Sequence, residues 1–191
     1  MNSWKTKSSM VVVLLLAISG VSFAQSKTER STPNWRTTFQ SRLALYGHRN
    51  WIVVADSAIP ASSQPGIETI VADSDLSSVL TYVMNAISSS RHVRATVFLD
   101  KELQFVDEGD FPGVTALRKQ IQAASGKSAP TSILHAEALS KLDDAGKAFR
   151  ILIIKTTTAI PYTSVFLRLD CGYVSDPIEQ KIRAAMDSAS K

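Results

Sequence analysis

Two short apolar runs constrain the fold of this chain more than any other feature. Trp51–Ala55 reads WIVVA, and Phe149–Lys155 reads FRILIIK with ILII at its centre. Strands that are apolar on both faces are typical of a sheet sandwiched between helices, because both faces are then buried. The sequence therefore predicts an α/β domain with a largely parallel or mixed sheet flanked by helices.

The segments around these runs alternate between helical and strand patterns. Between Asp75 and Ser90, apolar residues recur every three or four positions, which marks one face of a helix, and Asp73 or Ser74 is expected to cap it. We expect helices over Asn34–Tyr46, Asp75–Ser90, Val114–Ala124, His135–Leu142 and Asp176–Ala189, and further strands over Ile67–Ala72, Val93–Leu99 and Ser164–Leu169.

The length suits one domain. The chain has 191 residues, of which 45% are hydrophobic, and this is enough for one sizeable core but not comfortably for two. Residues 25–34 are polar and aperiodic, as in a linker. We therefore expect a single domain over residues 35–189.

The first 24 residues have the pattern of a secretory signal peptide. Lys5 and Lys7 precede the nine-residue apolar run Met10–Ile18, and Ser22–Ala24 (SFA) is a small-x-small cleavage site. Nine residues at about 1.5 Å each cover far less than the roughly 30 Å hydrocarbon core of a bilayer. We expect cleavage after residue 24 and a periplasmic or secreted product; the alternative is an uncleaved N-terminal anchor.

The positive charge of the chain is partly a property of this signal. The whole chain has a formal net charge of +4, but without the two lysines of the signal 19 basic residues face 17 acidic ones, a net charge of +2. No block of five like charges occurs. We therefore expect neither a nucleic-acid partner nor, after cleavage of the signal, a membrane partner.

Cysteine and histidine are too scarce for several kinds of site. A single cysteine, Cys171, excludes an intramolecular disulfide and a cysteine-cluster zinc site, and there are only three histidines. No P-loop, dinucleotide-binding glycine motif, GxSxG or HExxH occurs. We expect no metal and no cofactor.

Two residues beside the first apolar run are candidates for chemistry. His48 lies in the segment Gly47–Asn50 before the run, and a histidine has an unperturbed pKa of about 6.5, which suits proton transfer near neutral pH. Asp56 follows the run directly, and open α/β sheets bind ligands at the carboxyl ends of their strands. The alternatives are a structural or surface histidine and a turn aspartate.

Three further candidates come from the second half of the chain. Tyr162 and Ser164 precede a predicted strand and offer a phenol and a hydroxyl, although the segment could be only a structural loop. His135 opens a short helix, where capping or packing is the alternative role. We interpret His92 as a surface residue and Cys171 as a buried small apolar residue.

In order along the chain, these segments resemble the D-ribose pyranase / L-fucose mutarotase family. The similar segments are Tyr46–Pro60 (YGHRNWIVVADSAIP), His135 at the start of a helix, Pro161-Tyr162 before an apolar strand, and Cys171-Gly172 after it. The resemblance runs from about Arg42 to Val174.

The resemblance implies a ring-forming homo-oligomer that binds a monosaccharide where subunits meet. It implies that His48 is the catalytic histidine, and that Asp56, His135, Tyr162 and Ser164 contact the sugar. The implied reaction interconverts ring forms or anomers without a cofactor, by proton transfer. The alternative is a non-catalytic carbohydrate-binding or ring-forming structural protein on the same fold.

The chain departs from the family pattern in two places, and one spacing argues for a composite site. Asn50 stands where Asp is common, and Thr163-Ser164 stands where a small residue and Asn are usual. If residues 48–56 run nearly extended at about 3.3 Å each, His48 and Asp56 are roughly 26 Å apart in one chain. A neighbouring subunit would then complete the site.

Overall fold

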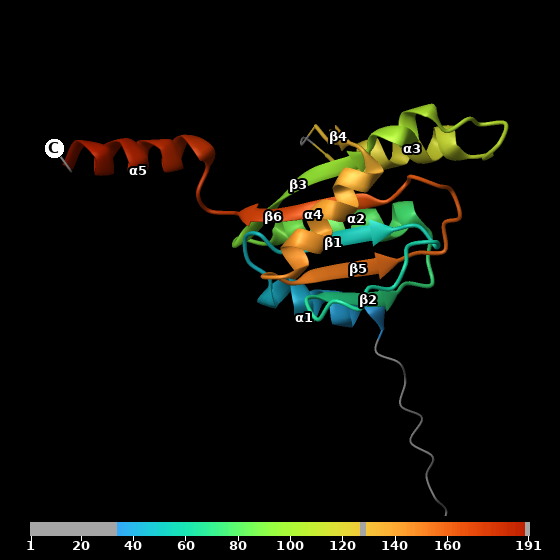
Figure 1. The fold of residues 1–191 in the computed structure, drawn as a ribbon, viewed down its shortest axis with the longest axis horizontal. Helices are drawn as coiled ribbons and strands as arrows, with labels where there is room; N and C mark the ends of the chain where they lie inside the picture. Colours follow the sequence, from blue (N-terminus) through green and yellow to red (C-terminus); the bar gives the residue numbers. More distant parts are fainter. Residues whose placement is uncertain (1–33, 127–128, 190–191) are drawn as a thin grey trace, which may run out of the picture. The chain divides into compact units, whose positions relative to one another are not determined.

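The computed structural model describes residues 34–126 and 129–189 (Figure 1). The signal peptide predicted over residues 1–24 and, except for Asn34, the linker predicted over residues 25–34 lie outside the described residues. None of the helices formed by the described residues could span a bilayer.

A six-stranded mixed sheet forms the centre of the domain, as the sequence predicts. Its strand order is β2-β5-β1-β6-β3-β4, and every neighbouring pair is parallel except the two that involve β6. Five strands therefore end at one edge of the sheet, and β6 begins there. The strands are β1 (Trp51–Ala55), β2 (Ile67–Val71), β3 (Val93–Asp100), β4 (Thr131–Ile133), β5 (Ile151–Lys155) and β6 (Val165–Cys171).

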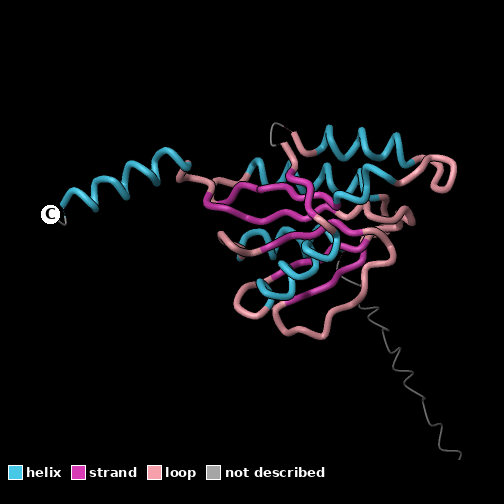
Figure 2. Tube along the Cα trace, turned by 45° about the horizontal axis from the view of Figure 1, so that its top comes forward, coloured by secondary structure: helices cyan, strands magenta, loops and turns pink. Residues whose placement is uncertain are grey.

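Helices lie on both faces of this sheet (Figure 2). One hydrophobic cluster joins α1, α2 and α3 to one face, and a second joins α4 to the other. The helices are α1 (Trp35–Leu45), α2 (Leu76–Ser89), α3 (Val114–Ala124), α4 (His135–Gly146) and α5 (Asp176–Ala189), with a 3-10 helix η1 (Lys101–Phe105) after β3.

Burial on two faces explains the apolar runs of β1 and β5. All five residues of β1 are buried, and they alternate between the two hydrophobic clusters. Ile52 and Val54 pack with α1 and α2, whereas Trp51, Val53 and Ala55 pack on the side of α4. A polar side chain at any of these positions would lie between the sheet and a helix.

The structure differs from the sequence-based expectation in a few elements. We did not expect η1 or β4, because runs of five and three residues are too short for periodicity to reveal. The helix that begins at His135 continues to Gly146 instead of ending at Leu142. The other elements begin and end within two residues of the expected positions.

The N-cap of α2 also corrects an expectation. The cap is Asp75, not Asp73 or Ser74, because its carboxylate accepts the backbone N–H of Ser78 at 2.9 Å and hydroxyl hydrogen bonds from Ser77 and Ser78. These donors lower the pKa of Asp75 to about 2.

Candidate functional site

The loops at the edge where the parallel strands end bring together residues that are far apart in the sequence. Asp56 follows β1, and Asp100 is the last residue of β3. His135 begins α4 just after β4, and Tyr162 and Ser164 precede β6. We call these five residues the strand-end cluster. It contains four of the five site residues that the sequence predicts.

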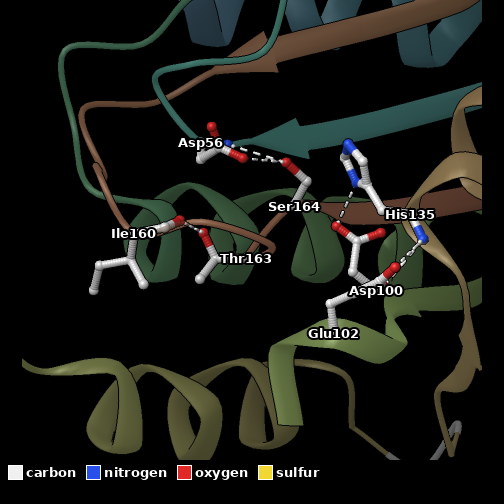
Figure 3. A network of polar contacts seen from close by, with 7 residues as sticks. All are labelled: Asp56, Asp100, Glu102, His135, Ile160, Thr163 and Ser164. Atoms are coloured by element: carbon white, nitrogen blue, oxygen red, sulfur yellow. Dashed lines mark hydrogen bonds and ion pairs between the residues drawn. The ribbon is translucent and has the colours of Figure 1, made fainter. Parts of the chain in front are cut away.

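Asp56 and Ser164 form a mutually hydrogen-bonded pair (Figure 3). The Ser164 hydroxyl is buried and donates to Oδ2 of Asp56 at 2.9 Å, while the backbone N–H of Asp56 donates to Oγ of Ser164 at 3.2 Å. The second carboxylate oxygen, Oδ1, accepts the N–H of Ala58 at 2.8 Å. Asp56 is therefore a turn aspartate, and its side chain also belongs to the strand-end cluster.

Asp100 forms a second pair with His135 (Figure 3). Oδ2 of Asp100 lies 2.8 Å from Nδ1 of His135, and the Asp100 side chain is fully buried. Burial raises the pKa of Asp100 to about 6, although the hydrogen bond from His135 acts in the opposite direction. Oδ1 of Asp100 is buried and has no hydrogen-bond partner among the described residues.

Glu102 fixes the backbone of His135. Both of its carboxylate oxygens lie 3.1 Å from the backbone nitrogen of His135, which donates to them. A carboxylate is favourable at this place because the free N–H groups of a helix N-terminus carry partial positive charge. His135 is thus held through its ring by Asp100 and through its backbone by Glu102.

The sequence reasoning missed Asp100 and Glu102. The strand pattern predicts an end at Leu99, one residue before Asp100, and so does not point to Asp100. A usable signal was present: Asp100 directly follows the predicted strand VRATVFL, in the same way that Asp56 follows WIVVA. For Glu102 the sequence carries no comparable signal, because its partner is the backbone of a residue 33 positions away.

Tyr162 lies beside His135 in a strained backbone conformation. The two rings meet edge to face, with centroids 5.5 Å apart and planes at 84°. Tyr162 has φ of +60°, a region that residues other than glycine rarely adopt and that is frequent at functional sites. The Thr163 hydroxyl donates to the carbonyl of Ile160 at 2.7 Å and so fixes the loop (Figure 3). Tyr162 itself remains 39% exposed.

His48 lies at the opposite edge of the sheet. It is exposed in the turn before β1, whereas Asp56 comes after β1, so the strand separates the two residues within one chain. His48 lines a surface pocket of about 540 Å³ together with residues such as Thr96, Asp170 and Tyr173. The strand-end cluster of a single chain therefore does not include His48.

Asn50 holds the turn that carries His48. Its Oδ1 accepts the N–H of Gly47 at 2.9 Å, and its Nδ2 donates to the carbonyl of Arg150 at 3.2 Å. An aspartate at this position could accept the first hydrogen bond but could not donate the second. The departure from the family pattern at Asn50 thus has a local structural role.

Two minor expectations have different outcomes. His92 is exposed, as expected. Its ring nitrogen Nε2 lies 3.1 Å from the carbonyl oxygen of Leu43 and 3.2 Å from that of Tyr46, so the ring contacts the end of α1. Cys171 is partly exposed and not buried, because it is the last residue of β6 and lies at the edge of the sheet.

The described residues also line a pocket away from the strand-end cluster. This larger pocket, of about 810 Å³, lies between α2 and α3, and among its described lining residues Arg94 is the only one with an ionisable side chain. Within residues 34–126 and 129–189, no group of three or more His, Cys, Asp or Glu side chains is arranged to hold a metal ion.

Comparison with known proteins finds similarity among solved structures. A comparison with protein-family models finds no match, and a comparison with curated protein sequences finds none either. Among solved structures, the chain is similar to Bacillus subtilis RbsD complexed with D-ribose, with 18% identity, a TM-score of 0.49, and coverage of 74% of this chain and 96% of that one.

Two further solved structures are similar over comparable lengths. The fucose mutarotase of Streptococcus pneumoniae in complex with L-fucose has 19% identity, a TM-score of 0.48, and coverage of 75% of this chain and 94% of that one. FucU from Bifidobacterium longum has 16% identity, a TM-score of 0.47, and coverage of 70% and 94%. In each case the similarity covers between 70% and 75% of this chain.

Proposed function

We propose that this protein binds a free monosaccharide at the strand-end cluster and catalyses the interconversion of its ring forms or anomers. The observation that carries the proposal is the convergence of Asp56, Ser164, Asp100, His135 and Tyr162 at one edge of the sheet. A sugar presents several hydroxyl groups that both donate and accept hydrogen bonds. The carboxylate of Asp56, the imidazole of His135 and the phenol of Tyr162 are suitable partners for them.

The reaction requires two proton movements. A proton leaves the anomeric hydroxyl and another reaches the ring oxygen, so a histidine with accessible acid and base forms is a suitable catalyst. We assign this role to His48. Because His48 lies at the opposite edge of its own sheet, the neighbouring subunit of a ring-shaped homo-oligomer supplies it, and the site lies at the subunit interface.

A second candidate function is sugar binding without catalysis. His48 is outside the cluster of its own chain, and the side chains of Asn50, Thr163 and Ser164 are already hydrogen-bonded within the chain. A chain that forms no composite interface would keep the binding groups and lack the catalytic histidine. For either function we propose an exported protein, on the evidence of the sequence of residues 1–24.

Saturation-transfer NMR with the mature protein tests both functions. D-ribose and L-fucose, the sugars of the family that the motifs resemble, begin a panel of pentoses and hexoses. We expect accelerated exchange between the ring forms or anomers of at least one sugar. Binding without accelerated exchange would favour the second function, and the absence of any binding would exclude both.

The hydrogen bond between Ser164 and Asp56 leads to a prediction about affinity. Ser164→Ala removes the donor that orients Oδ2 of Asp56, and we expect the Kd for the bound sugar to rise about 10-fold, the cost of roughly one charge-assisted hydrogen bond. NMR titration measures this change. Thr163→Ser is the control because it retains the hydroxyl that bonds to Ile160, and its Kd should stay within about twofold. An unchanged Kd in Ser164→Ala would exclude Asp56 from the binding site.

A further inference from the structure

We propose that His135 exchanges protons with the bound sugar through Nε2, and that Asp100 is the positioning residue that keeps the other ring proton on Nδ1. This proposal rests on the proposed function and deepens it, because it adds a second acid–base group to the same site. The family resemblance implies only a sugar contact for His135.

The first support is the way in which the ring of His135 is held. Nδ1 faces the buried carboxylate of Asp100 at 2.8 Å, and the backbone nitrogen is fixed by Glu102. Nε2 lies on the side of the ring away from Asp100 (Figure 3), and among the described residues it has no hydrogen-bond partner. The His135 side chain is 32% exposed, so a ligand can reach it.

The second support is the electrostatic environment of Asp100. Three titratable groups face its carboxyl group: Glu102 from η1, Asp56 from the end of β1, and His135 from α4. Burial favours the neutral carboxyl most, His135 favours the charged one, and the two acids add to the effect of burial. With a pKa of about 6, Asp100 is ionised at pH 8 and can only accept a hydrogen bond, so Nδ1 must carry the proton.

The consequence is that, in the neutral imidazole of His135, Nδ1 carries the proton and Nε2 has a free lone pair. As the pH falls through about 6, Asp100 gains a proton and can donate to Nδ1, which moves the ring proton to Nε2. The ability of His135 to act as a base is then lost. A buried carboxylate behind a histidine has the same orienting role in the Ser-His-Asp arrangement.

The reaction can use two histidines, one that accepts a proton and one that donates a proton. In the opening step Nε2 of His135 takes the proton of the anomeric hydroxyl, and the released electron pair forms the C1=O bond. The bond between C1 and the ring oxygen breaks, its electron pair goes to the ring oxygen, and the protonated His48 of the neighbouring subunit donates a proton there. Rotation about C1–C2 and closure by the reverse steps return both histidines to their starting states.

The positioning role can be tested without any measurement of activity. The ¹⁵N chemical shifts of histidine ring nitrogens distinguish the two neutral tautomers, and a His135→Gln spectrum identifies the His135 signals among the three histidines. In the mature wild-type protein at pH 8 we expect a protonated Nδ1 and an unprotonated Nε2. A wild-type His135 with its proton on Nε2 would overturn the proposal.

Asp100→Asn should reverse this tautomer. One of the two polar atoms of the asparagine amide must occupy the position of Oδ1, where no hydrogen-bond partner is present among the described residues. The amide oxygen is expected there, because a buried N–H without an acceptor is less tolerated than a buried carbonyl. The amide NH₂ therefore faces Nδ1 and donates to it, so the ring proton moves to Nε2. Glu102→Gln is the matched control because it contacts only the backbone of His135, and its tautomer should remain as in the wild type.

Kinetics then separate this proposal from the proposed function. We expect kcat for sugar exchange to fall about 100-fold in Asp100→Asn at pH 8 with KM within threefold, and wild-type kcat to fall as the pH drops through about 6. A reversed tautomer with unchanged kcat would overturn the role of His135. If the wild-type protein does not accelerate sugar exchange, the proposed function and the proton transfer by His135 are both overturned. The tautomer of His135 would still show whether Asp100 has its positioning role.

Discussion

His48→Ala is expected to lower the rate of sugar exchange at least about 100-fold while leaving the Kd of the sugar within a few-fold of the wild-type value. The reason is that His48 is outside the strand-end cluster and, on the proposed function, acts only on the proton transfer. Saturation-transfer NMR gives the rate, and titration gives the Kd. An exchange rate that remains within threefold of the wild type would exclude His48 as the catalytic histidine.

A mixing experiment decides whether the site is composite. His48→Ala and Asp56→Ala are each expected to be inactive, because each removes one half of every site. In rings assembled at random from both variants, about a quarter of the interfaces combine an intact His48 with an intact Asp56 of the neighbouring chain, and activity should return to that level. Each variant assembled alone is the control. If the mixed rings stay inactive, the two residues do not act across an interface.

Asp100→Asn is expected to change how the free energy of unfolding depends on pH. The pKa of Asp100 is about 6 in the folded protein, above its ordinary value of 3.8, so the folded state holds a proton that the unfolded state has already lost. This contribution to stability is fully present below about pH 4 and is lost as the pH rises through about 6. Asparagine does not ionise, so its contribution to the free energy of unfolding does not change between pH 4 and pH 6.

The stability of Asp100→Asn relative to the wild type should therefore rise by about 2 kcal/mol between pH 4 and pH 7, since one pKa unit corresponds to about 1.4 kcal/mol and the contribution is not yet complete at pH 4. Urea unfolding at a series of pH values measures this difference. Asp143→Asn, at an exposed position of α4, is the matched control and should stay within about 0.5 kcal/mol of the wild type at every pH. A difference for Asp100→Asn that does not vary with pH would show that Asp100 is ionised equally in both states.

Much of the fold could be predicted because its signals are local. The runs in β1 and β5 are apolar since each strand is covered on both faces, and the spacing of α2 places its apolar residues on one side. The elements that escaped prediction, η1 and β4, are too short for a periodic pattern. Both matter for the site: η1 carries Glu102, and β4 leads directly into His135.

The sequence by itself determined the α/β class, the helices and longer strands, and the identity of Asp56, His135, Tyr162 and Ser164 as candidates. Only the tertiary structure decided which of them meet. Asp56 and Ser164 are 108 positions apart and Asp100 and His135 are 35 apart, so their hydrogen bonds depend on strand order and direction. The same order leaves His48 at the far end of β1, because β1 separates the two edges of the sheet.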